Sequence, residues 1–503
     1  MSKEYNLSAG KGYDKFSIES IFEYSQRLLG KSLREALEDE VMTDSAKDGL
    51  HKRVADDTDI DFQKHNKGGF GQMIEELYFK YHPNSNPGPD FKEAGMELKA
   101  TGLKKLKKTG EYQIKERLVC DIINYEEVVN QTFEDSTFYR KCRIMLILFY
   151  LYQKNTNNWD LKFIYSVVWK MSAKDLDIIE HDFYTIVAKI KAGKAHLLSE
   201  GDTEYLGACR KGNKDTGLRP QPYSDIRAPQ RAFSLKPAYM RTVLEYIRSS
   251  GKRAASNFDI STEERGLVSA EELKHQSFED IILSRFRPFI GLNYMEICSK
   301  LGMEPTKAKQ KFAIVANAIA TKGFAIKGLK QIDDSEEFQK SGIRLKTVRQ
   351  NANGKVEQCM AFENIDYQEI YDNDSWIDSR LYEIFTNRFL FVVFHQPEGQ
   401  LVKNKNADQY ILTDVFFWTM PAHDIEIAKE YWENIRQQVL KNRISLDNFW
   451  HMADDRLFHV RPKAQKATDR TANPNGGEAP KYCYWFNSSY TEDIIASQHK
   501  KNG

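Results

Sequence analysis

Apolar residues along the 503-residue chain follow two different spacings, one typical of helices and one typical of strands. Within residues 67–80, Phe70, Ile74 and Leu77 recur at intervals of three and four, as on one face of a helix. Short apolar or alternating runs indicate buried strands at residues 94–100, 117–124, 144–152 and 389–395. Further helices are expected over residues 15–38, 172–192 and 422–441. This mixture predicts the α/β class, with a mixed sheet flanked by helices in each half of the chain.

One sequence pattern occurs twice in the chain. Residues 90–100 align without a gap with residues 337–347, which lie 247 positions later. Two further matches follow in the same order, and the offset grows slowly to 251, as loop insertions in a duplicated domain would leave it. We therefore expect two tandem domains that arose by duplication. The further matches pair residues 168–177 with 417–426 and, more loosely, residues 232–239 with 483–490.

The length of the chain supports this division, because 503 residues exceed the roughly 100 to 200 residues typical of one domain. A small, polar stretch at residues 249–257 follows a helix-like run and is the natural place for the join. We place the boundary near residues 250–265. The predicted domains are then residues 1–250 and residues 265–503.

Composition is that of a globular protein that does not cross a membrane. Hydrophobic residues make up 41% of the chain and charged residues 29%, so each half can bury a core. The longest apolar stretch, residues 144–152, is far shorter than the roughly 20 residues of a membrane helix, and the N-terminus is too charged for a secretory signal. We expect a cytoplasmic protein whose six singly spaced cysteines are reduced and structural.

Charge is informative only locally, because the net charge is +1. Residues 99–117 contain seven lysines and arginines against two glutamates, which suits contacts with phosphates. A solvated, lysine-rich loop explains the same stretch. The charge pattern alone favours the loop.

The candidate chemistry lies at Asp90, Glu97 and Lys99. Alternate side chains of a strand share a face, so Glu97 and Lys99 should project together, and Gly95 allows the chain to bend between Asp90 and that strand. Two converging carboxylates can hold Mg²⁺, which prefers oxygen ligands and leaves room for water and a substrate phosphate. Lys99 could orient a water or neutralise charge at phosphorus. The spacing alone is a loose pattern, but an upstream helix adds a further acid, Glu75.

These residues resemble the MutH-like endonucleases, which comprise a mismatch-repair nickase and the two-domain type II restriction enzymes that recognise GATC. The resemblance covers nearly the whole chain, and the additional C-terminal copy is similar to the restriction branch. Its marks are residues 67–75, Pro89-Asp90, Gly95 to Lys99, Glu116 to Val119, Gly193 to His196, Glu204 to Leu206 and Arg231 to Lys236.

The resemblance implies restriction-endonuclease-like domains, with Asp90 and Glu97 as ligands of Mg²⁺, Lys99 as the catalytic lysine and Glu75 completing the acidic site. In the second copy Glu337 aligns with Asp90, Arg344 with Glu97, Lys346 with Lys99 and Asn317 with Glu75. Because an arginine repels a cation, the C-terminal domain is expected to bind DNA as an effector without cutting it.

The residues that contact DNA are less sharply marked. Arginine pairs with guanine edges and lysine with phosphates, and the loop after the Tyr205-Leu206 strand and its counterpart in the second copy hold both. For each of these residues, a surface charge on a loop is an equally good interpretation. The candidates are Arg210, Lys211, Arg231, Lys236, Arg461 and Lys463.

The sequence therefore predicts a Mg²⁺-dependent type II restriction endonuclease that cleaves double-stranded DNA at GATC, engages two sites at once and pairs with a second chain on DNA. A strand-specific nickase of the mismatch-repair type is one alternative. A two-domain DNA-binding protein that does not cut is the other. The Gly30-Lys31-Ser32 run lacks the first glycine of a phosphate-binding loop, so an NTPase is rejected.

Overall fold

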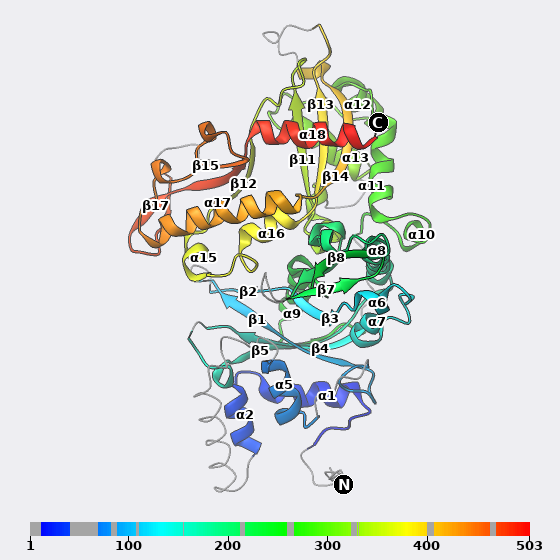
Figure 1. Ribbon diagram of the computed structural model, residues 1–503, viewed down its shortest axis with the longest axis vertical. Helices are drawn as coiled ribbons and strands as arrows, with labels where there is room; N and C mark the ends of the chain where they lie inside the picture. Colours follow the sequence, from blue (N-terminus) through cyan, green and yellow to red (C-terminus); the bar gives the residue numbers. More distant parts are fainter. Residues whose placement is uncertain are drawn as a thin grey trace. The chain divides into compact units, whose positions relative to one another are not determined.

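The computed structural model describes most of the chain and divides it into two compact units (Figure 1). The first unit comprises residues 1–198 and 205–264, and the second comprises residues 199–204 and 265–503. The mixed α/β class is confirmed, because both units combine helices with several small sheets. The described residues are 12–40, 69–81, 88–106, 110–153, 155–211, 217–258, 266–322, 329, 331–399, 407–462 and 469–502.

The first unit is built on a five-stranded sheet with the order β10-β5-β4-β1-β2. Its central strand β4 is almost entirely apolar, pairs in parallel with β1 and antiparallel with β5, and is covered on both faces. The strands of the sheet are β1 (Glu97–Lys105), β2 (Tyr112–Ile114), β4 (Ile144–Leu151), β5 (Phe163–Lys170) and β10 (Ala254–Ser256).

Three helical segments pack on this sheet through a shared apolar core that includes Ile21, Phe70 and Leu146 (Figure 1). The helix expected over residues 15–38 is two helices, because the chain turns at Gly30 (φ 88°), whose N–H donates to the Phe163 carbonyl at 2.8 Å. These segments are α1 (Ile18–Ser25), α2 (Leu33–Glu40) and α5 (Gly69–Met73).

A second sheet of the first unit has the order β3-β9-β6, next to a hairpin formed by β7 and β8. The long helix α8 begins at the Ser172 cap, and its buried Asp182 accepts hydrogen bonds from the backbone of Tyr205 and Leu206. The remaining elements are β3 (Leu118–Ile122), β6 (Leu206–Arg210), β7 (Leu218–Gln221), β8 (Ser224–Pro229), β9 (Arg231–Leu235), α6 (Tyr125–Val128), α7 (Thr137–Cys142), α8 (Ala173–Lys191) and α9 (Pro237–Ser249).

The second unit contains a sheet ordered β11-β13-β14 and another ordered β12-β18-β15. Its aromatic-rich core includes Phe389, Trp418 and Phe486. Its strands are β11 (Arg344–Gln350), β12 (Met360–Asn364), β13 (Phe389–His395), β14 (Ile411–Trp418), β15 (Phe458–Pro462), β16 (Arg470–Ala472), β17 (Glu478–Pro480) and β18 (Tyr482–Phe486). Its helices are α10 (Ala270–Leu273), α11 (Phe278–Phe286), α12 (Tyr294–Leu301), α13 (Lys311–Ala320), α14 (Glu336–Ser341), α15 (Tyr367–Asp372), α16 (Arg380–Thr386), α17 (Ala422–Leu440) and α18 (Ser488–Asn502).

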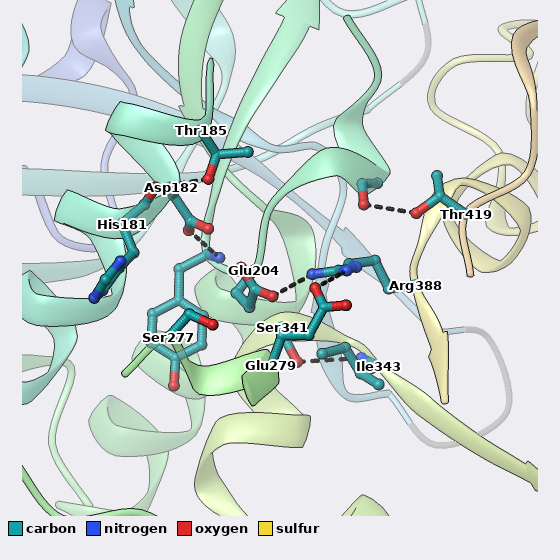
Figure 2. A network of polar contacts seen from close by, with 12 residues as sticks. His181, Asp182, Thr185, Glu204, Ser277, Glu279, Ser341, Ile343, Arg388 and Thr419 are labelled. Carbon is teal, nitrogen blue, oxygen red and sulfur yellow. Dashed lines mark hydrogen bonds and ion pairs between the residues drawn. The ribbon is translucent and has the colours of Figure 1, made fainter. Parts of the chain in front are cut away.

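The second unit also includes Ser199–Glu204, six residues from the middle of the sequence. Figure 2 shows how they are held there: the Arg388 guanidinium pairs with both Glu204 and Glu279. The Thr419 hydroxyl donates to the Gly201 carbonyl at 2.7 Å (Figure 2). Two carboxylates on one largely buried guanidinium make charge-assisted hydrogen bonds, which are stronger than neutral ones.

Trp169 and Trp418, which stand at corresponding places on β5 and β14, are both buried. All six cysteines are free, and five of them are buried. No helix within the described residues is long and apolar enough to cross a membrane.

Candidate active site

Strand β1 places Glu97 and Lys99 on one side of the sheet. The Lys99 Nζ donates to Glu97 Oε1 at 2.6 Å, while Leu98 between them is buried in the core. The expectation that these two side chains project together is confirmed. Glu97 itself is only 3% exposed, so its charge is compensated by a short ion pair rather than by bulk water.

The segment before β1 brings Asp90 back to the start of the strand. Gly95 adopts a left-handed conformation (φ 66°), which lets Phe91 and Met96 pair across the turn. The backbone N–H of Asp90 donates to Glu97 Oε2 at 3.1 Å, and the N–H of Leu98 donates to Asp90 Oδ2 at 3.0 Å. The bend expected at Gly95 is present, and it joins the two candidate ligands through reciprocal hydrogen bonds.

The third acid, Glu75, lies in a π-helical turn (η2, Ile74–Tyr78) that follows α5. Such turns widen a helix by one residue and are frequent at functional sites. Burial, with the negative charges of Asp90 and Glu97, raises the pKa of Glu75 to about 7. The shift places Glu75 within electrostatic reach of both candidate ligands, so the structure brings Glu75, Asp90, Glu97 and Lys99 together.

The electrostatics of this cluster show excess negative charge. Burial raises the pKa of Glu97, against the lowering effect of Lys99, and Asp90 raises it further. Burial disfavours the charged form of Lys99, but Glu97 overrides this and raises the Lys99 pKa overall. Repulsion among three carboxylates facing one ammonium is the condition that a divalent cation relieves.

The donor chemistry fits Mg²⁺. Asp90 and Glu97 supply carboxylate oxygens, and Mg²⁺ is usually held by one or two carboxylates together with water and substrate phosphates. Among the residues that the structure describes, no group of three or more His, Cys, Asp or Glu side chains could hold a metal ion. A site with two carboxylates, completed by the substrate, is compatible with that finding.

One further charged residue of the site was not anticipated from the sequence. Lys141 in the last turn of α7 pairs with Asp121 at 3.4 Å and lowers the Glu97 pKa through its charge. Lys141 lies 44 residues after Glu97, and no spacing rule links them. Only the packing of α7 beside β3 and β4 brings it near.

In the second unit, Asp333 takes the structural role of Asp90. The N–H of Leu345 donates to Asp333 Oδ1 at 2.9 Å, as the N–H of Leu98 donates to Asp90. The assignment of Glu337 to this position was wrong: its buried carboxylate accepts hydrogen bonds from the N–H groups of Leu267 and Val268. The ungapped alignment failed because α14 adds about one helical turn between Asp333 and β11.

The other three expected counterparts, Arg344, Lys346 and Asn317, lie near Asp333 or the residue directly before it. Arg344 NH1 is 3.9 Å from Asp333 Oδ2, and the Lys346 Nζ donates to the Ala361 carbonyl at 3.1 Å. The Asn317 side-chain oxygen accepts from the N–H of Ile332, directly before Asp333. An arginine and an asparagine therefore lie near Asp333, whereas Asp90 has two glutamates near it.

The candidate DNA contacts differ in accessibility. Arg210 and Lys211 lie half-buried at the end of β6, and Arg231 on β9 donates to the Ala208 carbonyl at 2.6 Å. Lys236 is only 3% exposed, so a phosphate contact does not fit this structure, and we withdraw it from the candidates. Arg461 on β15 lies over the Trp485 ring at 4.1 Å. Lys463 lies outside the described residues.

This fold and this cluster define a nuclease site of the MutH type. Comparison with known proteins agrees with that class. Residues 79–182, which include Asp90, Glu97 and Lys99, match the family described as DNA mismatch repair enzyme MutH. The chain is also 34% identical over 476 residues to the type II restriction enzyme Sau3AI of Staphylococcus aureus, covering 89% of this chain and 92% of that enzyme. The chain belongs to this family of MutH-related type II restriction endonucleases, which confirms the resemblance found in the sequence.

Proposed function

We propose that the first unit hydrolyses a phosphodiester bond of double-stranded DNA at GATC, with Mg²⁺ held by Asp90 and Glu97. The observation that carries this proposal is the cluster at the start of β1, where Asp90, Glu97, Lys99 and Glu75 converge. The GATC site follows from the resemblance to the restriction branch. When bound, Mg²⁺ would supply an activated water and offset the charge that develops on the phosphate.

The residues of the chain have distinct tasks in this proposal. Hydrogen bonds between the Asp90 loop and β1 fix the two ligands relative to each other, which reduces the entropy lost when substrate binds. Glu97 keeps the Lys99 ammonium protonated, so Lys99 presents a fixed positive charge toward the phosphate. Glu75, with its raised pKa, is suited to accept a proton from the attacking water near neutral pH.

We propose further that the two units arose by duplication and that the second binds DNA as an effector without cutting. The strand order β11-β13-β14 of the second unit corresponds to β1-β4-β5 of the first. In the same way, β12-β18-β15 corresponds to β3-β9-β6. Register supports the same pairing: Met145 faces Trp169, and Phe389 faces Trp418. The charge reversal from Glu97 to Arg344 argues against a metal in the second unit.

A chain with one acidic cluster can cut one strand at a time. A double-strand break then requires two chains that pair on DNA, or two successive nicks by one chain. We favour pairing on DNA, as in the restriction branch of the family. The nickase alternative shares the acidic cluster and differs only in the product.

The test is to incubate purified protein with unmethylated supercoiled plasmid, in Mg²⁺ and in EDTA, and to sequence the product ends. Linear fragments that end at GATC, formed only with Mg²⁺, are the expected result. Nicked circles alone would favour the nickase. Plasmid that is retarded on a gel but uncut in Mg²⁺ would identify a DNA-binding protein and contradict the proposal.

A further inference from the structure

A two-stranded ribbon of the first unit, formed by β7 and β8, presents charged and aromatic side chains to solvent (Figure 1). A tight turn joins its strands, because Gln221 at the end of β7 pairs with Ser224 at the start of β8. Arg219 and Arg227 on the two strands are exposed, and Tyr223 in the turn is 75% exposed. The outer surface of the ribbon is therefore accessible to a partner.

The positive charge of the ribbon is not neutralised by the residues that the structure describes. Arg219 Nη2 donates to the side-chain oxygen of Gln230 at 3.2 Å, and Arg227 Nη2 donates to the Leu218 carbonyl at 3.0 Å. Both acceptors are neutral, and neither guanidinium forms an ion pair with a described carboxylate. Along the sequence, residues 210–231 contain six lysines and arginines against two aspartates. Since a guanidinium has five N–H donors, most remain available to an anionic ligand.

Apolar side chains are exposed beside these arginines. Leu218 and Ile226 lie on the strands of the ribbon, and Leu197 lies in η4 (Ala195–Leu197), a short 3-10 helix next to β8. These three side chains are between 42% and 56% exposed. A group of exposed apolar residues of this kind marks a binding surface more often than a scattered single residue does.

The ribbon is held firmly at the end of α8. The buried Gln221 side chain accepts a hydrogen bond from the Ala195 N–H at 2.7 Å, and its amide donates to the Ile226 carbonyl. Gly193 (φ 69°) follows α8, and a Cβ at this position would lie 2.6 Å from the Tyr223 carbonyl oxygen. The motif that begins at Gly193 therefore allows the ribbon to pack closely against the chain after α8.

The turn of the ribbon holds Tyr223 in a left-handed conformation (φ 62°). Glycine or asparagine is the usual residue there, because a Cβ is sterically disfavoured at positive φ. A tyrosine that is both strained and largely exposed adds little to the stability of the fold. Backbone strain of this kind is concentrated at binding sites, so the side chain is better explained by a ligand.

The ribbon continues the sheet that carries two candidate DNA contacts. Lys211, one residue after β6, donates its N–H to the Gln230 carbonyl at 2.7 Å, and the Gln230 N–H donates to the Gly217 carbonyl at 2.6 Å. Arg210 and Lys211 therefore stand at the base of the ribbon. A two-stranded ribbon fits the major groove of B-DNA, and cations along it are complementary to the flanking phosphates.

We propose that the β7-β8 ribbon is a DNA-binding arm of the first unit. It lies in a groove of the duplex, with Arg219 and Arg227 on backbone phosphates and Tyr223 against the sugars. The proposal rests on the proposed cutting of double-stranded DNA by this unit and names an element that holds the duplex. Because phosphate contacts carry no sequence information, the two arginines contribute to the affinity for any duplex.

The first experiment measures affinity by fluorescence anisotropy, in Mg²⁺ and at several salt concentrations, for the full chain with Glu97→Ala to prevent cutting. The probes are two fluorescent duplexes of equal length, one with a GATC site and one without. The double change Arg219→Ala and Arg227→Ala should weaken binding to both duplexes about 10-fold and lower the salt slope by roughly two. Unchanged affinity and salt slope would overturn the assignment of the arginines.

The matched control is Lys252→Ala, which removes an exposed cation of the same unit outside the ribbon. This change should alter the affinity by less than about twofold, as expected for a screened surface charge. A loss equal to that of the arginine variant would mean that the ribbon has no special role, and would overturn the inference.

Tyr223→Gly separates binding from folding. Glycine is favoured at positive φ, so the variant should unfold at the same or a higher temperature than the parent chain. Its affinity for both duplexes should fall about threefold, since an aromatic contact is lost, and the salt slope should not change. Unchanged affinity would overturn the assignment of Tyr223.

A photo-crosslinker in place of Tyr223 locates the contact independently of any DNA bound by the second unit. The full chain carries p-benzoylphenylalanine at this position and is irradiated with the fluorescent GATC duplex. A crosslink to DNA that excess unlabelled duplex abolishes is expected. A crosslink to a second copy of the chain, or no crosslink, would overturn the inference. Cutting of plasmid by the parent chain tests the proposed function separately, so the two failures can be told apart.

Discussion

The start of β1 and the start of β11 share a backbone arrangement but carry opposite charge. In both, an aspartate caps the second residue of the strand, Leu98 or Leu345, and a lysine follows one position later. The side chain before the leucine is glutamate at position 97 and arginine at position 344. The same backbone hydrogen bond is therefore present whether a carboxylate or a guanidinium stands beside it.

The comparison also separates structural from chemical roles of the same residue type. Asp90 and Asp333 both anchor the strand, so an aspartate at this position is explained by the backbone N–H that it accepts. Only Asp90 faces two further carboxylates. A carboxylate with a structural partner becomes a candidate metal ligand only when other acids face it.

The largest effect is expected from Glu97→Ala. Loss of this carboxylate should lower the rate of plasmid cleavage in Mg²⁺ by about 10³-fold, since electrostatic stabilisation of the reacting phosphate is lost. DNA binding should remain. Glu97→Gln, which can still accept the Asp90 N–H, should be as inactive and serves as the control for folding. Cutting by either variant would place the active site elsewhere.

Aspartate-to-asparagine changes at positions 90 and 333 test whether the two aspartates differ in chemistry. Each asparagine can still accept the backbone N–H, so both variants should fold. Asp90→Asn should slow single-turnover cleavage about 10²-fold. Asp333→Asn, at saturating enzyme, should change the rate by no more than about twofold. Equal losses of cleavage rate in the two variants would show that Asp90 and Asp333 do not differ in chemistry.

The raised pKa of Glu75 predicts a pH dependence of stability in EDTA. Because the folded-state pKa is about 7 and the ordinary value is 4.5, the stabilising contribution is complete below pH 4.5 and is lost as pH rises through 7. Unfolding by urea should show the first unit losing roughly 2 kcal/mol over this range. Glu75→Gln should flatten the profile, and Mg²⁺ should restore stability at pH 8. If the Glu75→Gln chain loses the same stability as pH rises, the titrating group is not Glu75.

The smallest effect is expected from Arg461→Ala. The Arg461 side chain lies over the Trp485 ring and is half-buried, so part of its contribution is packing. DNA affinity in EDTA should fall about threefold to fivefold, consistent with one partly screened contact. The Mg²⁺ dependence of cleavage should not change. Unaltered affinity would exclude Arg461 from the DNA-binding surface.

Much of the first site could be predicted from sequence because its parts are close along the chain. Strand periodicity alone places Glu97 and Lys99 together, and the left-handed Gly95 is compatible with the required bend. Glu75 could be selected as an acid near the end of a helix, but its π-helical turn could not be predicted. That turn depends on tertiary packing, which local spacing does not contain.

The second site shows where sequence reasoning failed. An ungapped match favoured Glu337 because the similarity of the following residues was strong, yet α14 inserts a turn and moves the functional counterpart to Asp333. Lys236 is a similar case: it lies in a family-like motif, but it caps α9 from a buried position. Burial and insertions are properties of the folded chain, and neither could be read from charge and spacing.

The hydrogen bond from Leu345 to Asp333 gives the start of β11 the same kind of backbone anchor as the start of β1. An acid already stands at the first ligand position, and Lys346 stands beside it. Two substitutions, Asn317→Glu and Arg344→Glu, would give the second unit the same set of side chains as the acidic cluster of the first. A chain with both changes would test whether that set is sufficient for a second cutting centre in one polypeptide.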